Sequence, residues 1–415
     1  MFYGDEKMQH LTNQQKLKPW MGFVLFAVVM IVFRFAGAPL QEMWGLPGLV
    51  ATELEFLVLA IVYALVFRIP VKEMFPIRKF SARDFFGSIC LGFGGVLFGL
   101  ISVALVGIFY PKSLEGGDVQ AIQSYIGGGV GYLIMIFAMA ILPAVCEEAI
   151  HRGAIIANFR AIKKDWVIVL IMGLFFGIFH LSTLRFINTA IMGACLTYIV
   201  VKKNNLILSM ITHFLINFVS STMSFMSTLS MKQSGALPED APAVQMTAAT
   251  MKAALGLYLW IGIAAPFLIV IGLMLLNPES HKKIRFLFAG ITAAVMFAGG
   301  MAVNISNTNG RQVAQSNFSY QVMAENTESL PVTFNVEEEG NYTVSVVTVN
   351  AKGEYFIRIE KDDGEFISRV DFSQGAIPTS SQQLDLEPGS YNIFIINGNG
   401  SIGEHPTFSV QVNRS

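Results

Sequence analysis

Residues 126–156 read IGGGVGYLIMIFAMAILPAVCEEAIHRGAII, and this stretch decides the fold of the chain. From Ile126 to Cys146 it contains no charged residue, and it then places two glutamates, a histidine and an arginine between positions 147 and 152. An apolar run of this length is typical of a membrane-spanning helix. Because a charge near the centre of a bilayer costs about 2.5–3.5 kcal/mol on insertion scales, such residues usually mark function. The stretch therefore predicts a transmembrane helix that carries a functional site.

The composition of the whole chain agrees with a membrane protein. Hydrophobic residues make up 53% of the 415 residues and charged residues only 14%, against about 25% charged residues in soluble domains. The formal net charge of −1 gives no reason to expect a nucleic-acid partner. The three cysteines all lie in apolar segments, so we expect no disulfide framework.

Nine apolar segments predict a polytopic α-helical membrane domain over residues 1–304. They lie at about 20–38, 46–67, 85–109, 129–159, 166–183, 186–201, 206–226, 253–276 and 286–304. Lysine and arginine concentrate in the N-terminal segment and in the connections after every second span, whereas the other connections are poor in them. Cytoplasmic loops carry this excess. We therefore expect an integral membrane protein, in contact with the lipid bilayer, with a cytoplasmic N-terminus and an extracellular C-terminal part. The absence of cysteines outside the apolar segments fits a bacterial plasma membrane.

The tail, residues 310–415, has a different composition and predicts a separate domain. Stretches such as NYTVSVVTVN and GSYNIFIING alternate apolar and polar residues, as half-buried strands do. The sequence KDDG at 361–364 is typical of a hairpin turn. We expect an extracytoplasmic all-β sandwich. It acts either as a stabilising module or by binding an extracytoplasmic partner.

Counting residues from the predicted turns places several polar side chains inside the membrane. Glu147 and His180 each lie about sixteen residues from the turn near Lys164, so they are expected at similar depth on antiparallel helices. His213 lies about nine residues beyond the next turn, and Asn217 follows one helical turn later. A carboxylate beside an imidazole is a general-base arrangement, and His213 with Asn217 offers donors for an oxyanion.

Spacing also predicts two ion pairs. Glu148 and Arg152 are four residues apart with the acid first, the better orientation on a helix. This leaves Glu147 to face another helix, and His180 is the expected partner. Arg34 and either Glu53 or Glu55 lie at similar distances from the turn near residue 45, so we expect a structural pair between the first two spans. Each intramembrane charge or histidine taken alone has a structural explanation as well.

Three segments carry a resemblance to a known family. Residues 147–152, EEAIHR, match EExxxR, residues 176–180, FGIFH, match FxxxH, and residues 213–217, HFLIN, match HxxxN. In this order on separate spans they resemble the motifs of the CAAX protease and bacteriocin-processing (CPBP, Abi) family of intramembrane glutamic endopeptidases, over a core of about 130–225. The resemblance implies that the chain cleaves a peptide bond of a membrane-associated peptide or protein without a cofactor. It assigns Glu147 and His180 to water activation, His213 and Asn217 to the oxyanion site, and supporting roles to Glu148, Arg152 and Phe176.

Two other functions stay open on the sequence. A zinc protease could use Glu147, His151, His180 and His213 as ligands, although no two histidines lie four residues apart. A non-catalytic membrane scaffold or immunity protein that binds a peptide or a partner is the other alternative, and the polar tail is the feature that favours it. The sequence leaves the substrate, and any role of prenylation, undecided.

Overall fold

The computed structural model describes residues 17–115, 131–233, 248–278, 282–308, 312–319, 328–329, 331–349, 355–372, 379–397 and 407–414. The chain divides into two compact units, which are described separately. The first contains the helices up to Val303 except the end of α12, and the second contains all the described strands. The N-terminal basic residues Lys7 and Lys16, used above to orient the chain, lie outside the described residues.

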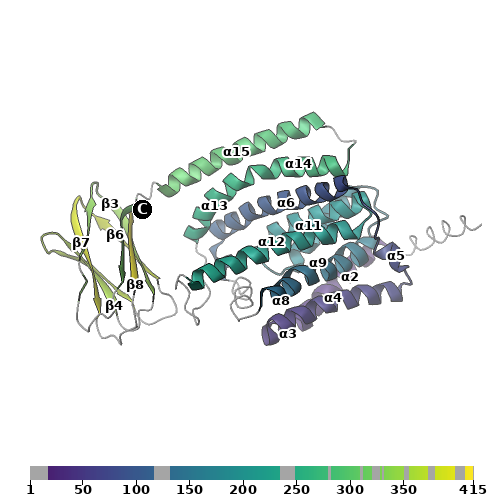
Figure 1. The fold of residues 1–415 in the computed structure, drawn as a ribbon, viewed down its shortest axis with the longest axis horizontal. Helices are drawn as coiled ribbons and strands as arrows, with labels where there is room; N and C mark the ends of the chain where they lie inside the picture. Colours follow the sequence, from purple (N-terminus) through teal and green to yellow (C-terminus); the bar gives the residue numbers. More distant parts are fainter. Residues whose placement is uncertain are drawn as a thin grey trace, which may run out of the picture. The chain divides into compact units, whose positions relative to one another are not determined.

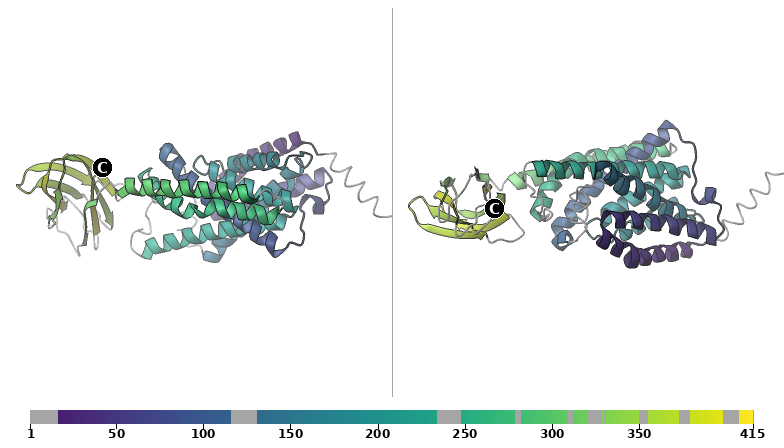
Figure 2. Two further views of the ribbon diagram at one scale, coloured as in Figure 1. Left: turned by 90° about the horizontal axis from the view of Figure 1, so that it is seen from above. Right: turned by 60° about the horizontal axis from the view of Figure 1, so that its bottom comes forward.

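The first unit is a bundle of apolar helices that run roughly alongside one another (Figures 1 and 2). Within the described part of the chain, eight helices are long and apolar enough to cross a membrane, and a ninth apolar helix is shorter. The α-helices are α2 (Pro19–Val32), α3 (Ala38–Trp44), α4 (Leu46–Val66), α5 (Val71–Met74), α6 (Ala82–Phe109), α8 (Tyr132–Ile136), α9 (Leu142–Glu148), α10 (Asp165–Phe179), α11 (Phe186–Lys203), α12 (Leu206–Gln233), α13 (Ala248–Gly262), α14 (Ala264–Leu276) and α15 (Lys282–Thr308).

The short helix α10 corresponds to the fifth predicted span, 166–183, and ends earlier than predicted. It has 15 residues, and His180 is its C-terminal cap. Leu181 follows with a positive φ of 48°, a conformation that ends a helix. The last predicted residues of this span therefore form a turn before α11 begins at Phe186.

Two of the membrane helices contain π-helical segments. η1 (Phe33–Gly37) joins α2 to α3 in the first span. In the fourth span, η3 (Phe137–Ile141) precedes α9, and η4 (Ala149–Ile155) follows it. A short 3₁₀ helix, η2 (Pro111–Glu115), follows α6. In the fourth span, π-helical segments therefore lie on both sides of Glu147 and Glu148.

The second unit is an antiparallel sandwich of two four-stranded sheets (Figure 1). One sheet has the order β1-β8-β3-β6 and the other β2-β7-β4-β5. The strands are β1 (Gln312–Ser319), β2 (Val332–Val336), β3 (Gly340–Val349), β4 (Tyr355–Lys361), β5 (Phe366–Phe372), β6 (Thr379–Leu386), β7 (Gly389–Asn397) and β8 (Thr407–Arg414). The expected hairpin joins β4 to β5, where Gly364 adopts a φ of 87°.

Alternate residues of both sheets form the core of the sandwich. Val344 and Val412 from one sheet pack in the same cluster as Phe334, Ile357 and Ile393 from the other. Strand β2 shows the alternation directly, since its burial switches at every residue. The predicted fold class, a helical membrane part followed by an all-β C-terminal part, is confirmed.

Candidate active site

The site is built on the fourth membrane helix, where the hydrogen-bonding pattern changes twice. Pro143 lies in the first turn of α9, and α9 ends at Glu148. His151 and Arg152 follow in the π-helical segment η4. π-Helical segments are rare in proteins overall, but those that occur are often found at functional sites. They change which side chains share a helix face, so neighbouring residues of this span point toward different helices.

Glu148 is held by donors from three residues. Nη1 of Arg152 donates to its Oε1 over 2.8 Å, and Nδ1 of His213 lies 3.0 Å from the same oxygen. The Ser209 hydroxyl donates to Oε2. Glu148 and Arg152 are both fully buried. A buried carboxylate is stable only when it is paired and hydrogen-bonded, and these three donors stabilise the negative charge of Glu148. The predicted ion pair between Glu148 and Arg152 is present.

The arginine has two further contacts that fix its plane. Nη2 of Arg152 donates to the backbone oxygen of Gly193 on α11 over 3.0 Å, and the guanidinium lies 4.4 Å from the ring centroid of Phe176. Thr197 donates to the same oxygen over 2.7 Å. Phe176 is fully buried. The supporting residues of the fourth, fifth, sixth and seventh spans therefore meet at Glu148 and Arg152.

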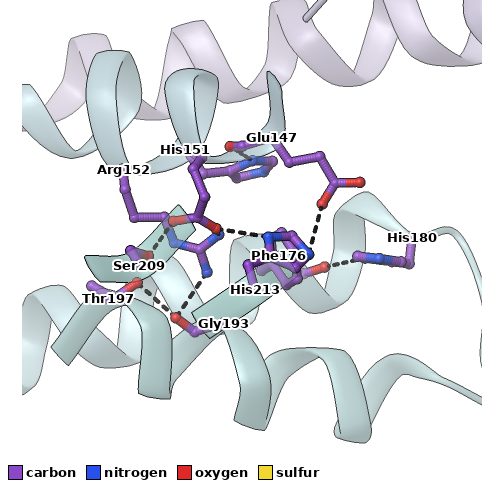
Figure 3. Close-up of polar contacts among 10 residues, drawn as sticks. Glu147, His151, Arg152, Phe176, His180, Gly193, Thr197, Ser209 and His213 are labelled. Carbon is purple, nitrogen blue, oxygen red and sulfur yellow. Dashed lines mark hydrogen bonds and ion pairs between the residues drawn. The ribbon is translucent and has the colours of Figure 1, made fainter. Parts of the chain in front are cut away.

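Glu147 points away from this network. Its Oε2 lies 3.9 Å from Nε2 of His213 and has no hydrogen-bond partner among the described residues (Figure 3). The residue is 7% exposed. The two adjacent glutamates thus differ in kind. Glu148 is saturated with donors, whereas one oxygen of Glu147 is available to a water molecule or a substrate.

The expected pairing of Glu147 with His180 differs from the observed contacts. Nδ1 of His180 donates to the backbone oxygen of Phe176 over 2.8 Å, because a carbonyl only accepts. The neutral ring then has an acceptor at Nε2. The described histidine contact of the Glu147 carboxylate is with His213. Counting residues fixes the level of a side chain in the membrane but not its direction around the helix axis, which explains the difference.

Two further residues considered in the sequence analysis, His151 and Asn217, differ in burial and in hydrogen bonding. His151 is fully buried; its Nδ1 donates to the backbone oxygen of Glu147 over 3.0 Å, and its ring packs edge-on against Phe179. Asn217 lies on α12 one turn after His213 and is half-buried. Asn217 has no hydrogen bond among the described contacts, so its amide remains available.

The residues proposed above as zinc ligands are not gathered around one point. Among the described residues, no group of three or more His, Cys, Asp or Glu is arranged to hold a metal ion. In each of His151, His180 and His213, Nδ1 contacts a protein oxygen. The three rings therefore have protein partners that orient them individually.

An open apolar hollow adjoins the turn that carries His180. Its volume is about 580 Å³. Gly177, Ile178 and Leu181, which flank His180, line it together with Phe109 of α6 and Phe186 of α11. The hollow gives this end of α10 an apolar surface next to an ionisable ring.

The three motifs and the residues of the buried network all lie in one segment of the chain. Residues 129–219 match the family model of type II CAAX prenyl endopeptidase, Rce1-like proteins. This match confirms the predicted resemblance to the CAAX protease family over this segment. The Rce1-like segment covers about a fifth of the chain and contains every predicted site residue. No protein of curated function matches the chain. The family indicates a membrane protease of the CAAX type, a peptide hydrolase.

Sequence reasoning missed two contributors to the site outside the motifs, Ser209 and Gly193. Ser209 precedes His213 by one helical turn, and this spacing could have indicated it. Gly193 has no signal in the sequence, since it acts through its backbone oxygen. The expected pair of Arg34 with Glu53 or Glu55 is not among the ion pairs of the described residues: Arg34 is exposed, whereas Glu53 is buried on α4.

Proposed function

We propose that the chain is an intramembrane endopeptidase that hydrolyses a peptide bond of a membrane-associated protein or peptide. The water is activated by Glu147 together with His180, without a cofactor. The observation that carries the proposal is the difference between the two adjacent glutamates. Glu148 is saturated by Arg152, His213 and Ser209, whereas Glu147 keeps a free carboxylate oxygen in a buried setting.

The hydrogen bonds of the two histidines support different roles. His180 donates from Nδ1 and therefore offers an acceptor at Nε2, as a residue that orients a nucleophilic water requires. His213 faces a carboxylate at each ring nitrogen, Glu148 at Nδ1 and Glu147 at Nε2. These contacts hold the His213 ring beside Glu147, where charge develops during attack by a water, and this supports a role in the oxyanion site.

The proposed reaction moves one proton through Glu147. The water oxygen bonds to the carbonyl carbon while its proton passes to the carboxylate. The negative charge on the carbonyl oxygen is stabilised by His213 and Asn217. The carbon–nitrogen bond then breaks, and Glu147 returns the proton to the leaving amine. Glu148 and Arg152 keep His213 oriented, and Phe176 packs against the guanidinium.

The orientation in the membrane belongs to the same proposal. We place the N-terminus in the cytoplasm and the sandwich outside a bacterial plasma membrane, because basic residues alternate between connections. The sandwich is then free to contact an extracytoplasmic partner. Single cysteines introduced into the sandwich of a Cys-free variant should react with a membrane-impermeant maleimide in intact cells. Labelling only after lysis would overturn this orientation.

The test of the proteolytic function compares membranes that contain the wild-type protein or Glu147→Gln at matched expression. Glu55→Gln, a change of the same kind on α4, serves as a control. New peptide termini should appear with the wild type and the control but not with Glu147→Gln, and they would identify the substrate. Identical terminal profiles, with an intact cellular phenotype in Glu147→Gln and His180→Ala, would favour the non-catalytic scaffold. Activity that is lost with chelators and restored by zinc would favour the zinc protease.

A further inference from the structure

The connection between α4 and α6, residues 67–81, joins two of the helices that are long and apolar enough to cross a membrane. It contains the short helix α5 and lies at one end of the helical bundle (Figure 1). Its single acid, Glu73, is half-buried. Its four basic residues are all exposed: Arg68, Lys72, Arg78 and Lys79. Because a span ends on each side of it, this α4–α6 connection lies at the boundary between hydrocarbon and water.

The protein provides no counter-ion for these four basic side chains. None of them has an ion-pair or hydrogen-bond partner among the residues that the structure describes. The acids at the starts of α6 and α10 are already paired with lysines of α11. Nζ of Lys203 lies 2.6 Å from Oδ1 of Asp84, and Nζ of Lys202 lies 2.6 Å from Oδ2 of Asp165. The charges of the connection are therefore available to an anion from outside the protein.

Exposed apolar side chains alternate with these charges. Val71, Ile77 and Phe80 are all exposed, and 68% of Ile77 is accessible. They continue the exposed apolar surface of the two spans, which includes Val66 at the end of α4 and Phe86 near the start of α6. A surface that combines basic and apolar side chains at the bilayer boundary has the chemistry of a segment that lies in the headgroup region.

The backbone of the connection is fixed by hydrogen bonds to the start of α12. Nδ2 of Asn205 donates to the backbone oxygen of Arg78 over 2.8 Å, and the backbone N–H of Arg78 donates to Oδ1 of Asn205 over 3.3 Å. The backbone N–H of Leu206 donates to the oxygen of Pro76 over 2.7 Å. The basic side chains at positions 78 and 79 are thus carried by an ordered backbone, which lowers the entropic cost of binding a ligand.

The inner face of the connection contacts the elements of the candidate active site. Met74 is fully buried, and Phe75 packs so closely against Gly153 that a Cβ at that glycine would lie 2.5 Å from the Phe75 ring. Gly153 belongs to η4, which also carries Arg152. The hydrogen bonds of the connection lead to α12, the helix of His213. A ligand on the outer face would therefore hold the connection against both elements.

We propose that the α4–α6 connection binds the headgroups of acidic phospholipids. The phosphate oxygens accept charge-assisted hydrogen bonds from the basic side chains, while Val71, Ile77 and Phe80 enter the edge of the hydrocarbon layer. The ligand is a lipid and not a soluble phosphate, because only a lipid places hydrocarbon beside its phosphate group. This binding does not depend on the proposed protease function.

The first test measures lipid binding to the full-length protein in a neutral detergent. Phosphatidylglycerol or phosphatidylcholine is titrated in, and bound lipids are counted by native mass spectrometry. The wild type should bind phosphatidylglycerol more tightly than phosphatidylcholine. Arg78→Gln with Lys79→Gln should weaken the binding of phosphatidylglycerol by about 30-fold, the effect expected for two basic residues at an acidic lipid surface. The binding of phosphatidylcholine should not change.

The matched control is Lys163→Gln with Lys164→Gln, which removes two adjacent exposed charges from the connection before α10. It should keep the wild-type affinity for phosphatidylglycerol. Equal losses in the two double variants, or no loss in either, would overturn the proposal. Soluble glycerol phosphate should not displace the lipid, and displacement would show that the site takes a soluble phosphate instead.

The second test locates the apolar side chains of the connection in a bilayer. A nitroxide is attached to Ile77→Cys in a variant without the three native cysteines, reconstituted in nanodiscs that contain phosphatidylglycerol. Its collision rate with oxygen should exceed that with a water-soluble nickel complex. The same label on Asp363→Cys, in the exposed turn of the sandwich, gives the aqueous reference. An equally aqueous profile at position 77 would overturn the proposal.

Discussion

Replacing Arg152 by methionine tests the buried network most directly. The substitution keeps an unbranched chain of similar length but removes the 2.8 Å ion pair with Glu148, the 3.0 Å hydrogen bond to Gly193 and the contact with the Phe176 ring. Glu148 would then remain as a fully buried negative charge with donors only from His213 and Ser209. Breaking a buried pair by removing one partner costs about 3–5 kcal/mol. We expect a loss of that size in the free energy of unfolding.

The assay is equilibrium unfolding in a mild detergent of the wild type, Arg152→Met, Glu148→Gln and the double variant. Because the double variant leaves no unpaired charge, it should be more stable than either single variant. The coupling energy of the cycle should exceed about 1 kcal/mol, since the two side chains touch. Additive effects, or an Arg152→Met variant within about 1 kcal/mol of the wild type, would show that the pair carries no such energy.

Three further changes have expected outcomes that follow from single contacts. Ser209→Ala removes the donor to Oε2 of Glu148 and should destabilise the helical unit by about 1–3 kcal/mol, measured by the same unfolding assay. In Gly193→Ala the new Cβ would lie 2.5 Å from Cβ of Phe176. This overpacking should lower the free energy of unfolding by about 1–3 kcal/mol and reduce cleavage activity. Unchanged stability and activity would contradict this prediction. Ile393→Ala in the sandwich core should cost about 2–5 kcal/mol, seen by calorimetry as a lower transition for the sandwich and an unchanged one for the helices.

Local spacing made part of the site predictable. The Glu148–Arg152 pair follows from a separation of four residues on one helix, and the structure contains it. Length and apolar character located the membrane helices, and alternation located the sandwich. These features depend on neighbours in the sequence. Their physical causes are helix periodicity, desolvation of the backbone and the two faces of a strand.

Contacts between helices were harder to predict. They depend on the depth of a side chain in the membrane and also on its direction around the helix axis, and a residue count gives only the depth. Glu147 and His180 were expected to meet at one level, yet the described histidine partner of the Glu147 carboxylate is His213. Either Glu53 or Glu55 was expected to pair with Arg34, which is exposed instead. The direction of a side chain depends on how each helix is rotated and on the π-helical segments, which no residue count reveals.

The short helix α10 has a consequence for the bilayer around it. Fifteen residues span about 22 Å, whereas the hydrocarbon layer is about 30 Å thick. The turn from His180 to Arg185 covers the rest, and its backbone groups need hydrogen-bond partners that lipid tails do not supply. A bilayer that matches the length of this helix would be thinner beside the turn, and the aqueous boundary would then lie closer to His180. A hydrolytic reaction inside a membrane depends on such a local supply of water.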